Sequence, residues 1–287
     1  MKKNMKRLAA GLLCAALVWL FFGLISYANP PEEPLKLLVL GDSIAAGSGV
    51  NDKNDAYAWL VAEEKGYALS NRGAGGDSSA LMRVKVETDE AIREEIAGAD
   101  IIAVSIGGND FLHAERFAAL FVNGLLGDYS LMEPLHAAFR ENFTGIVDGI
   151  RALNPDAMLI VQTLYNPFVP LLPSLTEAYN AAVGGNNAAV YAYLADNPGA
   201  YLIADVYTAF QGRYFMVSID MTHPAAGGHA VIARVLLDTI DGTQTLAPVS
   251  PGALDVLLGI LRPLFTLLDR VLVTALRLLA PLVTLFA

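Results

Sequence analysis

The sequence has a single cysteine, Cys14, among 287 residues, and it is poor in basic side chains. One cysteine excludes a disulfide within the chain and a cysteine-based metal site. The 19 lysines and arginines against 29 aspartates and glutamates give a formal net charge of −10. A protein this acidic repels a phosphate backbone, so no nucleic-acid partner is expected. No glycine-rich stretch matches a P-loop or a dinucleotide-binding fingerprint.

The N-terminus has the opposite charge. Four basic residues precede an apolar run over 8–25, and no acidic residue occurs before Glu32. Small residues follow at Ser26-Tyr27-Ala28, where a signal peptidase requires them. Residues 1–28 are therefore expected to be a signal peptide cleaved after Ala28, or else an uncleaved membrane anchor, because the run is nearly long enough to span a bilayer. Both interpretations predict an exported protein that is extracellular or lies in the cell envelope. Association with a membrane is compatible with both. Residues 29–34 (NPPEEP) are proline-rich and are predicted to form a linker.

Strand-like and helix-like segments alternate through the middle of the chain. Continuous apolar runs typical of strands covered on both faces occur over 35–40, 101–106, 158–164 and 200–206, with a further strand at 67–71. Helical patterns occur over 56–65, 87–97, 132–153, 176–195 and 228–240. The alternation predicts a domain over 35–246 with a parallel sheet and helices on both faces.

A second proline-containing break, APVSP at 247–251, precedes a very apolar segment, 252–287. On a helix its charges form one narrow polar stripe, made by Asp255, Arg262, Asp269, Arg270 and Arg277. The polar face of an ordinary surface helix is broader. The segment is therefore expected to lie in a membrane interface, or to form a helix pair, broken at Pro263 and Pro281, that packs on the body or on another copy. A spanning helix is disfavoured, because two arginines would lie deep in the hydrocarbon.

The stretch LVLGDSIAAGSGV (38–50) is the first chemical signal. An apolar strand stops at Gly41-Asp42-Ser43, and ligands of parallel α/β sheets bind beyond the carboxyl ends of the strands. A helix starting there would aim its N-terminal amides at the same point. Ser43 is therefore a candidate nucleophile, with a helix cap as the alternative role.

A serine nucleophile needs a base, and His223 has the most suggestive surroundings. Asp220 precedes it by three residues, and Pro224 follows. On a loop, this carboxylate can bind one ring nitrogen and leave the other for the serine; the alternative is that Asp220 caps the next helix. Of the remaining histidines, His113 is expected at a strand end and is a second site candidate. His136 is expected on a helix surface, and His229 at the start of the last helix.

Two glycine-rich loops offer hydrogen-bond donors for a developing oxyanion. SIGGND (105–110) follows a predicted strand and includes the Asn109 amide. Residues 71–79 contain three glycines that let the backbone approach a ligand.

Together these segments resemble the GDSL, or SGNH, hydrolase family over about 35–240. The matching blocks are Gly41-Asp42-Ser43, Gly76-Asp77-Ser78, Gly107-Gly108-Asn109-Asp110 and Asp220-Met221-Thr222-His223-Pro224. The resemblance implies a three-layer α/β/α sandwich with a central parallel sheet.

The resemblance also implies residue roles. Ser43 would be the nucleophile, His223 the general base and acid, and Asp220 the residue that orients it. The oxyanion site would consist of the Ser43 and Gly76 backbone N–H groups and the Asn109 side chain. No metal or organic cofactor is implied.

The expected function is hydrolysis of carboxylic esters through an acyl-enzyme, with a lipid or another acyl ester as substrate. Residues 165–173 are predicted to line an acyl pocket, with a packed surface loop as the alternative. Phe111-Leu112 and residues 117–126 are predicted to add a lid. Alternatives are a carbohydrate O-acetyl esterase or an acyltransferase on the same site, and a non-catalytic, membrane-associated envelope protein. Contact with a membrane surface is expected through 252–287.

Overall fold

The computed structural model describes residues 33–113, 117–168, 172–213, 216–247, 249 and 253–283, together with Trp19. The predicted signal peptide, apart from Trp19, lies outside the described residues, as does most of the predicted linker. Leu35–Ala287 form one compact unit and Met1–Pro34 another.

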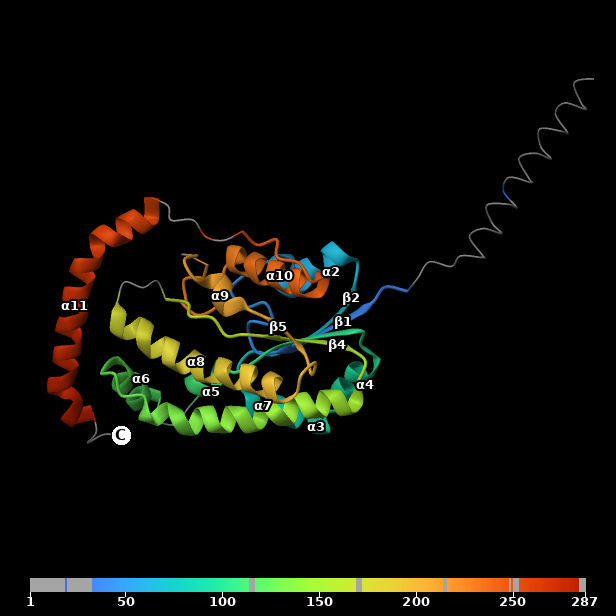
Figure 1. Cartoon of the computed structure of the whole chain (residues 1–287), viewed down its shortest axis with the longest axis horizontal. Helices are drawn as coiled ribbons and strands as arrows, with labels where there is room; N and C mark the ends of the chain where they lie inside the picture. The colour runs from blue at the N-terminus through green and yellow to red at the C-terminus, as the bar shows by residue number, and fades with distance from the viewer. Residues whose placement is uncertain are drawn as a thin grey trace, which may run out of the picture. The chain divides into compact units, whose positions relative to one another are not determined.

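The centre of the larger unit is a parallel sheet of five strands in the order β2-β1-β3-β4-β5 (Figure 1). The strands are β1 (Lys36–Gly41), β2 (Ala68–Gly73), β3 (Ile101–Ser105), β4 (Met158–Gln162) and β5 (Leu202–Ala204). Leu37 of β1 pairs with Leu69 on one side and Ile101 on the other. The predicted parallel sheet is therefore confirmed.

Helices cover both faces of the sheet, as Figure 1 shows. On one face lie α2 (Tyr57–Lys65), α9 (Val206–Phe210) and α10 (Ala226–Asp241). On the other lie α3 (Ser79–Thr88), α4 (Glu90–Gly98), α7 (Glu133–Leu153) and α8 (Pro173–Asp196). The shorter elements are η1 (Lys53–Asp55), α5 (Asn109–Leu112), α6 (Phe117–Leu125) and η2 (Ser130–Met132).

Alternate side chains of β1 enter two different cores. Leu38 is buried in a cluster with Phe139 of α7, whereas Leu37 is buried with Tyr57 of α2 and Leu236 of α10. This two-residue period explains why the strand is apolar throughout. Each large apolar side chain buried in this way contributes about 1.5–3 kcal/mol.

Two predicted boundaries differ from the structure because aspartates cap helices. The helix expected over 87–97 is divided at Asp89, which ends α3 and accepts a hydrogen bond from the Ile92 N–H at 3.1 Å to start α4. The last strand is shorter than 200–206, because Asp205 caps α9 through the Thr208 N–H.

The C-terminal segment is one helix, α11 (Ala253–Val283), so the expected helix pair is wrong. Pro263 and Pro281 both lie within α11. Proline has no N–H, so Pro263 leaves the Gly259 carbonyl without its helical hydrogen bond. Both residues are exposed, and this carbonyl can bond to water instead. In the part of the chain that is described, no helix is both long and apolar enough to cross a membrane.

Candidate active site

Ser43 follows the carboxyl end of β1, at the edge of the sheet where α/β proteins bind ligands. Gly41 permits the close approach of β1 to β3, because a Cβ there would lie 2.3 Å from the Ser105 carbonyl oxygen. The segment 43–49 is a hydrogen-bonded turn and not the expected regular helix. Gly47 and Gly49 have φ angles of 75° and 99°, which a right-handed helix does not allow.

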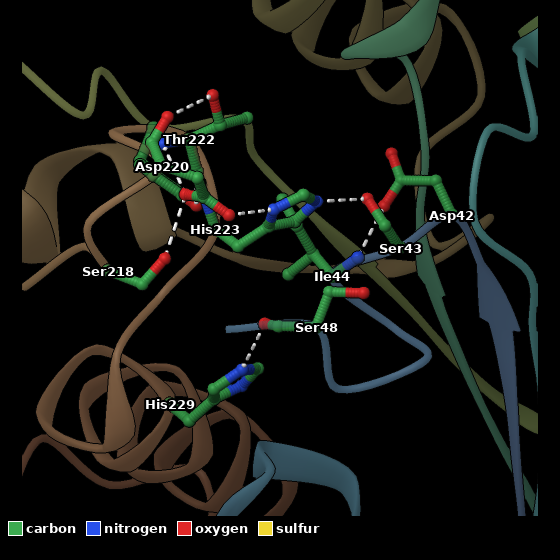
Figure 2. Close-up of polar contacts among 10 residues, drawn as sticks. Asp42, Ser43, Ile44, Ser48, Ser218, Asp220, Thr222, His223 and His229 are labelled. Atoms are coloured by element: carbon green, nitrogen blue, oxygen red, sulfur yellow. Dashed lines mark hydrogen bonds and ion pairs between the residues drawn. The ribbon is translucent and has the colours of Figure 1, made fainter. Parts of the chain in front are cut away.

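The structure brings together Ser43, His223 and Asp220, which the sequence predicted as a triad (Figure 2). The His223 Nε2 atom lies 2.8 Å from the Ser43 Oγ atom. On the other side of the ring, Nδ1 lies 2.7 Å from the Asp220 Oδ2 atom. An ionised carboxylate only accepts, so Nδ1 carries the ring hydrogen and Nε2 accepts from the serine hydroxyl.

The loop that contains His223 is organised by the Asp220 carboxylate. Its Oδ1 atom accepts hydrogen bonds from Ser218 Oγ at 2.8 Å and from the Thr222 and His223 N–H groups at 2.9 Å each (Figure 2). Burial alone would raise the pKa of Asp220, but the hydrogen bonds from His223, Thr222 and Ser218 outweigh it and hold the pKa well below its usual range. Met221 has a φ of 58°, an uncommon conformation for a residue with a side chain. The carboxylate is therefore charged and fixed in position.

Sequence reasoning missed two residues that position this loop. Ser218 binds Asp220, and its only sequence signal is a hydroxyl two residues before the acid. Gly49 lets the turn after Ser43 touch the loop, because a Cβ there would lie 2.1 Å from the Pro224 carbonyl oxygen and 3.0 Å from the His223 Cβ. Both residues act on the alignment of the imidazole with the serine.

The predicted oxyanion residues line the same cleft as Ser43, which has a volume of about 370 Å³. Asn109 is 7% exposed, and its Nδ2 atom donates to the Asp77 carbonyl at 2.9 Å. This bond fixes the amide and leaves its second hydrogen for a ligand. Gly76 precedes Asp77 in the loop and also lines the cleft. Four of the five predicted site residues, Ser43, Gly76, Asn109 and His223, thus line one cavity. The fifth, Asp220, lies behind His223 and is bonded to its Nδ1 atom.

A second, more apolar cavity of about 220 Å³ adjoins this cleft. Residues common to both linings are Gly108, Leu112, Tyr179, Val183 and Thr222. Helices α6 and α8 supply most of its apolar wall, including Phe117, Leu120, Phe121, Leu175 and Ala178. Of the predicted pocket segment 165–173, Tyr165 and Pro167 line the cleft and Phe168 lines the apolar cavity, whereas 169–171 lie outside the described residues.

Comparison with known proteins decides the family. The model of the GDSL-like lipase/acylhydrolase family matches residues 39–231, more than half of the chain. The chain belongs to this family. It is an ester hydrolase.

Individual known proteins are similar to this GDSL-like hydrolase over about three quarters of its length. The uncharacterized protein YpmR of Bacillus subtilis (strain 168) is 26% identical over 226 residues, which cover 75% of this chain and 85% of that protein. The structure of the lipase Lip_vut3 from a goat rumen metagenome superposes with a TM-score of 0.60 at 22% identity, covering 74% of this chain and all of that one. A variant of Axe2, an acetyl xylan esterase from Geobacillus stearothermophilus, gives a TM-score of 0.52 at 18% identity, covering 76% and 98%. At these identities the two structures show a shared fold, the three-layer α/β/α sandwich.

The other histidines of this GDSL-like hydrolase differ in their surroundings. His113 lines the same cleft as Ser43. His136 was expected on a helix surface, and this is wrong: it is buried, with Nε2 3.0 Å from the Ala182 carbonyl oxygen. Gly185 on α8 makes room for it, since a Cβ there would lie 2.3 Å from the imidazole.

His229 lies in the first turn of α10 and is fully buried. Its Nε2 atom lies 3.0 Å from the Ser48 carbonyl oxygen (Figure 2), and its Nδ1 atom accepts from the Tyr57 N–H at 3.3 Å. Burial lowers the pKa of His229, so the ring is neutral and donates from Nε2. Its role is to tie the turn after Ser43 to α2 and α10. Among the described residues, no cluster of three or more histidine, cysteine or acidic side chains is arranged to hold a metal ion.

Asp42, next to Ser43, is a buried carboxyl group whose importance the sequence did not reveal. Its Oδ1 atom accepts from the Ile44 N–H at 2.9 Å (Figure 2), and the side chain is almost inaccessible to solvent. Burial raises the pKa of Asp42 to about 7, although the Ile44 hydrogen bond and the charge of His223 act in the opposite direction. Asp42 is therefore partly protonated near neutral pH.

The pKa of Asp42 predicts a pH-dependent effect of Asp42→Asn on stability. Between the unfolded value of 3.8 and the folded value of about 7, the folded protein keeps a proton that the unfolded chain has lost. The stability that this proton contributes is complete below the unfolded pKa and is lost as the pH rises through the folded pKa. The Asp42→Asn variant has no such loss. Its free energy of unfolding, relative to that of the wild type, should therefore rise by up to about 4 kcal/mol between pH 4 and 8. Urea unfolding of both proteins across this range measures it, and a constant difference between the two would contradict the assignment.

Proposed function

We propose that the protein cleaves carboxylic esters that carry apolar acyl chains, with Ser43 as nucleophile, His223 as base and acid, and Asp220 as its orienting partner. The observation that carries the proposal is the continuous hydrogen-bonded line from Ser43 Oγ through the imidazole to Asp220 Oδ2, with distances of 2.8 and 2.7 Å. The line ends in the cleft at the carboxyl edge of the sheet.

The first half of the reaction acylates the serine. Ser43 Oγ attacks the ester carbonyl carbon while its proton passes to His223 Nε2, and the carbonyl π electrons move onto the oxygen. The backbone N–H groups of Ser43 and Gly76 and the free hydrogen of the Asn109 amide bind this oxyanion, each contributing about 3 kcal/mol as in comparable sites. When the carbonyl reforms, the bond to the alcohol oxygen breaks and Nε2 gives its proton to the alcohol.

The second half repeats these steps with water. Nε2 takes a proton from water as the water oxygen attacks the acyl-enzyme, and it then returns a proton to Ser43 Oγ as the acid leaves. Asp220 accepts from Nδ1 throughout and stabilises the imidazolium that forms in each half. Since the carboxylate has a lowered pKa, it stays ionised beside the protonated ring.

The size of the apolar cavity is the reason for proposing an acyl chain longer than acetyl. An apolar cavity of about 150 Å³ is large enough to bind benzene, and the cavity here has about 220 Å³. Val183 lies at its junction with the catalytic cleft, because it lines both. Each methylene group buried there contributes about 0.8 kcal/mol, or roughly fourfold in kcat/KM.

Val183→Phe should fill this junction and shorten the preferred acyl chain. We expect kcat/KM for a long-chain p-nitrophenyl ester to fall at least about tenfold, because the alkyl chain loses burial of two or more methylene groups. Cleavage of p-nitrophenyl acetate should change much less. Ala192→Phe, at an exposed position of the same helix, is the control for adding a phenyl ring to α8.

The same substrates distinguish the proposal from a carbohydrate O-acetyl esterase. A wild-type preference for long-chain esters over acetylated oligosaccharides supports the acyl cavity as part of the site. A clear preference for the acetylated sugar, with both α8 variants indistinguishable on the long-chain ester, would contradict it.

A further inference from the structure

Helix α11 has an apolar face that no described part of the chain covers. Among residues 255–278, six aliphatic side chains are more than half exposed: Val256, Ile260, Leu264, Leu267, Val271 and Leu278. Their spacing of three, four and seven residues places them on one side of the helix. This stripe is roughly 33 Å long at 1.5 Å per residue. Soluble proteins rarely expose a continuous apolar surface of this kind without a binding partner.

The buried Asp269 fixes which side of α11 faces outward. Asp269 is 7% exposed, and its carboxylate accepts from Ser174 Oγ at 2.5 Å and from the Ser174 N–H at 3.3 Å. Ser174 lies in the first turn of α8, where free N–H groups and the helix dipole favour an anion. Asp269, which belongs to the predicted polar stripe, therefore points into the protein. The apolar stripe lies on the opposite side of α11 and points away from the protein.

The charges beside the apolar stripe favour an anionic lipid surface. Arg270 and Arg277 lie along one edge of the stripe and are exposed, while Asp269, the one acidic residue between 256 and 278, is buried. Arg262, seven residues before Asp269, lies on the side of the helix opposite the stripe. Two copies packed face to face would bring the arginines at the edge of the stripe near one another. An anionic bilayer instead offers hydrocarbon to the stripe and phosphate groups to these two arginines.

The position of α11 connects this face with the proposed acyl cavity. α11 packs on α6 and α8 (Figure 1), the two helices that supply most of the cavity's apolar wall. The Ser174 contact lies one residue before Leu175, which lines the cavity. A lipid surface bound to α11 would lie beside the helices that enclose the acyl chain.

We infer that the exposed face of α11 docks the protein on an anionic membrane surface, with the aliphatic stripe in the interface and Arg270 and Arg277 on the headgroups. The docking does not depend on the ester chemistry. Docking would also bring membrane-borne esters to the apolar cavity, and this contribution to catalysis rests on the proposed function.

Vesicle sedimentation tests the docking directly. The chain from residue 29 is used, because the apolar run over 8–25 would itself bind lipid and Leu35–Ala287 form a compact unit without it. Leu264→Glu/Val271→Glu should lower the affinity for phosphatidylcholine–phosphatidylglycerol vesicles at least about tenfold, because two buried aliphatic side chains are lost. The control, Leu81→Glu/Val84→Glu, makes the same changes on α3 at 45% and 50% exposure and should bind as the wild type does.

Charge and catalysis are tested separately. Arg270→Gln/Arg277→Gln should reduce binding to the anionic vesicles roughly fivefold per arginine and leave binding to pure phosphatidylcholine unchanged. The α11 glutamate pair should cleave dissolved p-nitrophenyl acetate normally, which also shows that it folds, and should lose at least about tenfold on a long-chain ester carried in the vesicles. Ser43→Ala should bind vesicles like the wild type, so loss of hydrolysis and loss of docking are separate results.

Three results would overturn the inference. The first is a wild-type chain that does not sediment with anionic vesicles. The second is equal binding by the α11 and α3 glutamate pairs. The third is a stable dimer in the absence of lipid that the α11 glutamate pair dissociates, while neither the wild type nor any variant binds vesicles. That result would make a second copy of the chain the occupant of this face.

Discussion

Replacing Ser43 with alanine should lower kcat for ester cleavage by about a millionfold, the loss seen when the nucleophile of a comparable triad is removed. The variant should stay folded, because the Ser43 hydroxyl bonds to His223 on the surface of the cleft and is not part of either core. Initial rates with p-nitrophenyl esters measure the loss, and the urea midpoint checks the fold.

Ser48→Ala is the matched control for this change. Ser48 lies on the same turn, and its carbonyl, which the substitution retains, contacts His229. Its activity should stay within a few-fold of the wild type. A Ser43→Ala protein with wild-type activity would remove Ser43 from the mechanism.

Asp220→Asn should lower kcat by about ten-thousandfold, the effect of the equivalent change in a well-studied triad. The amide loses the charge that stabilises the imidazolium, and it can present N–H to Nδ1 and so select the wrong ring tautomer. The loop should persist, because an amide oxygen can still accept from the Thr222 and His223 N–H groups.

Asp205→Asn provides the comparison for Asp220→Asn. Asp205 also accepts a backbone hydrogen bond, from the Thr208 N–H, but it caps α9, whereas Asp220 contacts the His223 ring. Its variant should keep wild-type kcat. Equal, small effects of the two substitutions would show that Asp220 only stabilises its loop.

Much of the fold was predictable because its signals are local. Strands buried on both faces are continuous apolar runs, and β1, β3 and β4 appear where such runs were found. Helix α3 was missed except for its last two residues, which fall in the helix predicted over 87–97. The break at Asp89 was also missed, because the helical pattern continues through that residue and only the cap geometry shows that α3 ends and α4 begins there. The family motifs likewise located Ser43 and His223, whose hydrogen bond joins positions 180 residues apart.

Features that depend on tertiary burial were not predictable in this way. The raised pKa of Asp42 arises from its burial, and the buried position of His136 depends on the missing side chain of Gly185. The periodic charges of α11 indicated a stripe but not its orientation. Asp269 turns inward because Ser174, distant in sequence, offers it an N–H and a hydroxyl at the start of α8.

The most direct test of the central claim is to react the folded protein with a fluorophosphonate and locate the adduct by mass spectrometry. The account predicts one adduct, on Ser43, whose formation is abolished in Ser43→Ala and strongly slowed in His223→Ala, in parallel with ester cleavage. An unlabelled Ser43 in a protein that still hydrolyses esters, or an adduct on another serine that tracks activity, would contradict it.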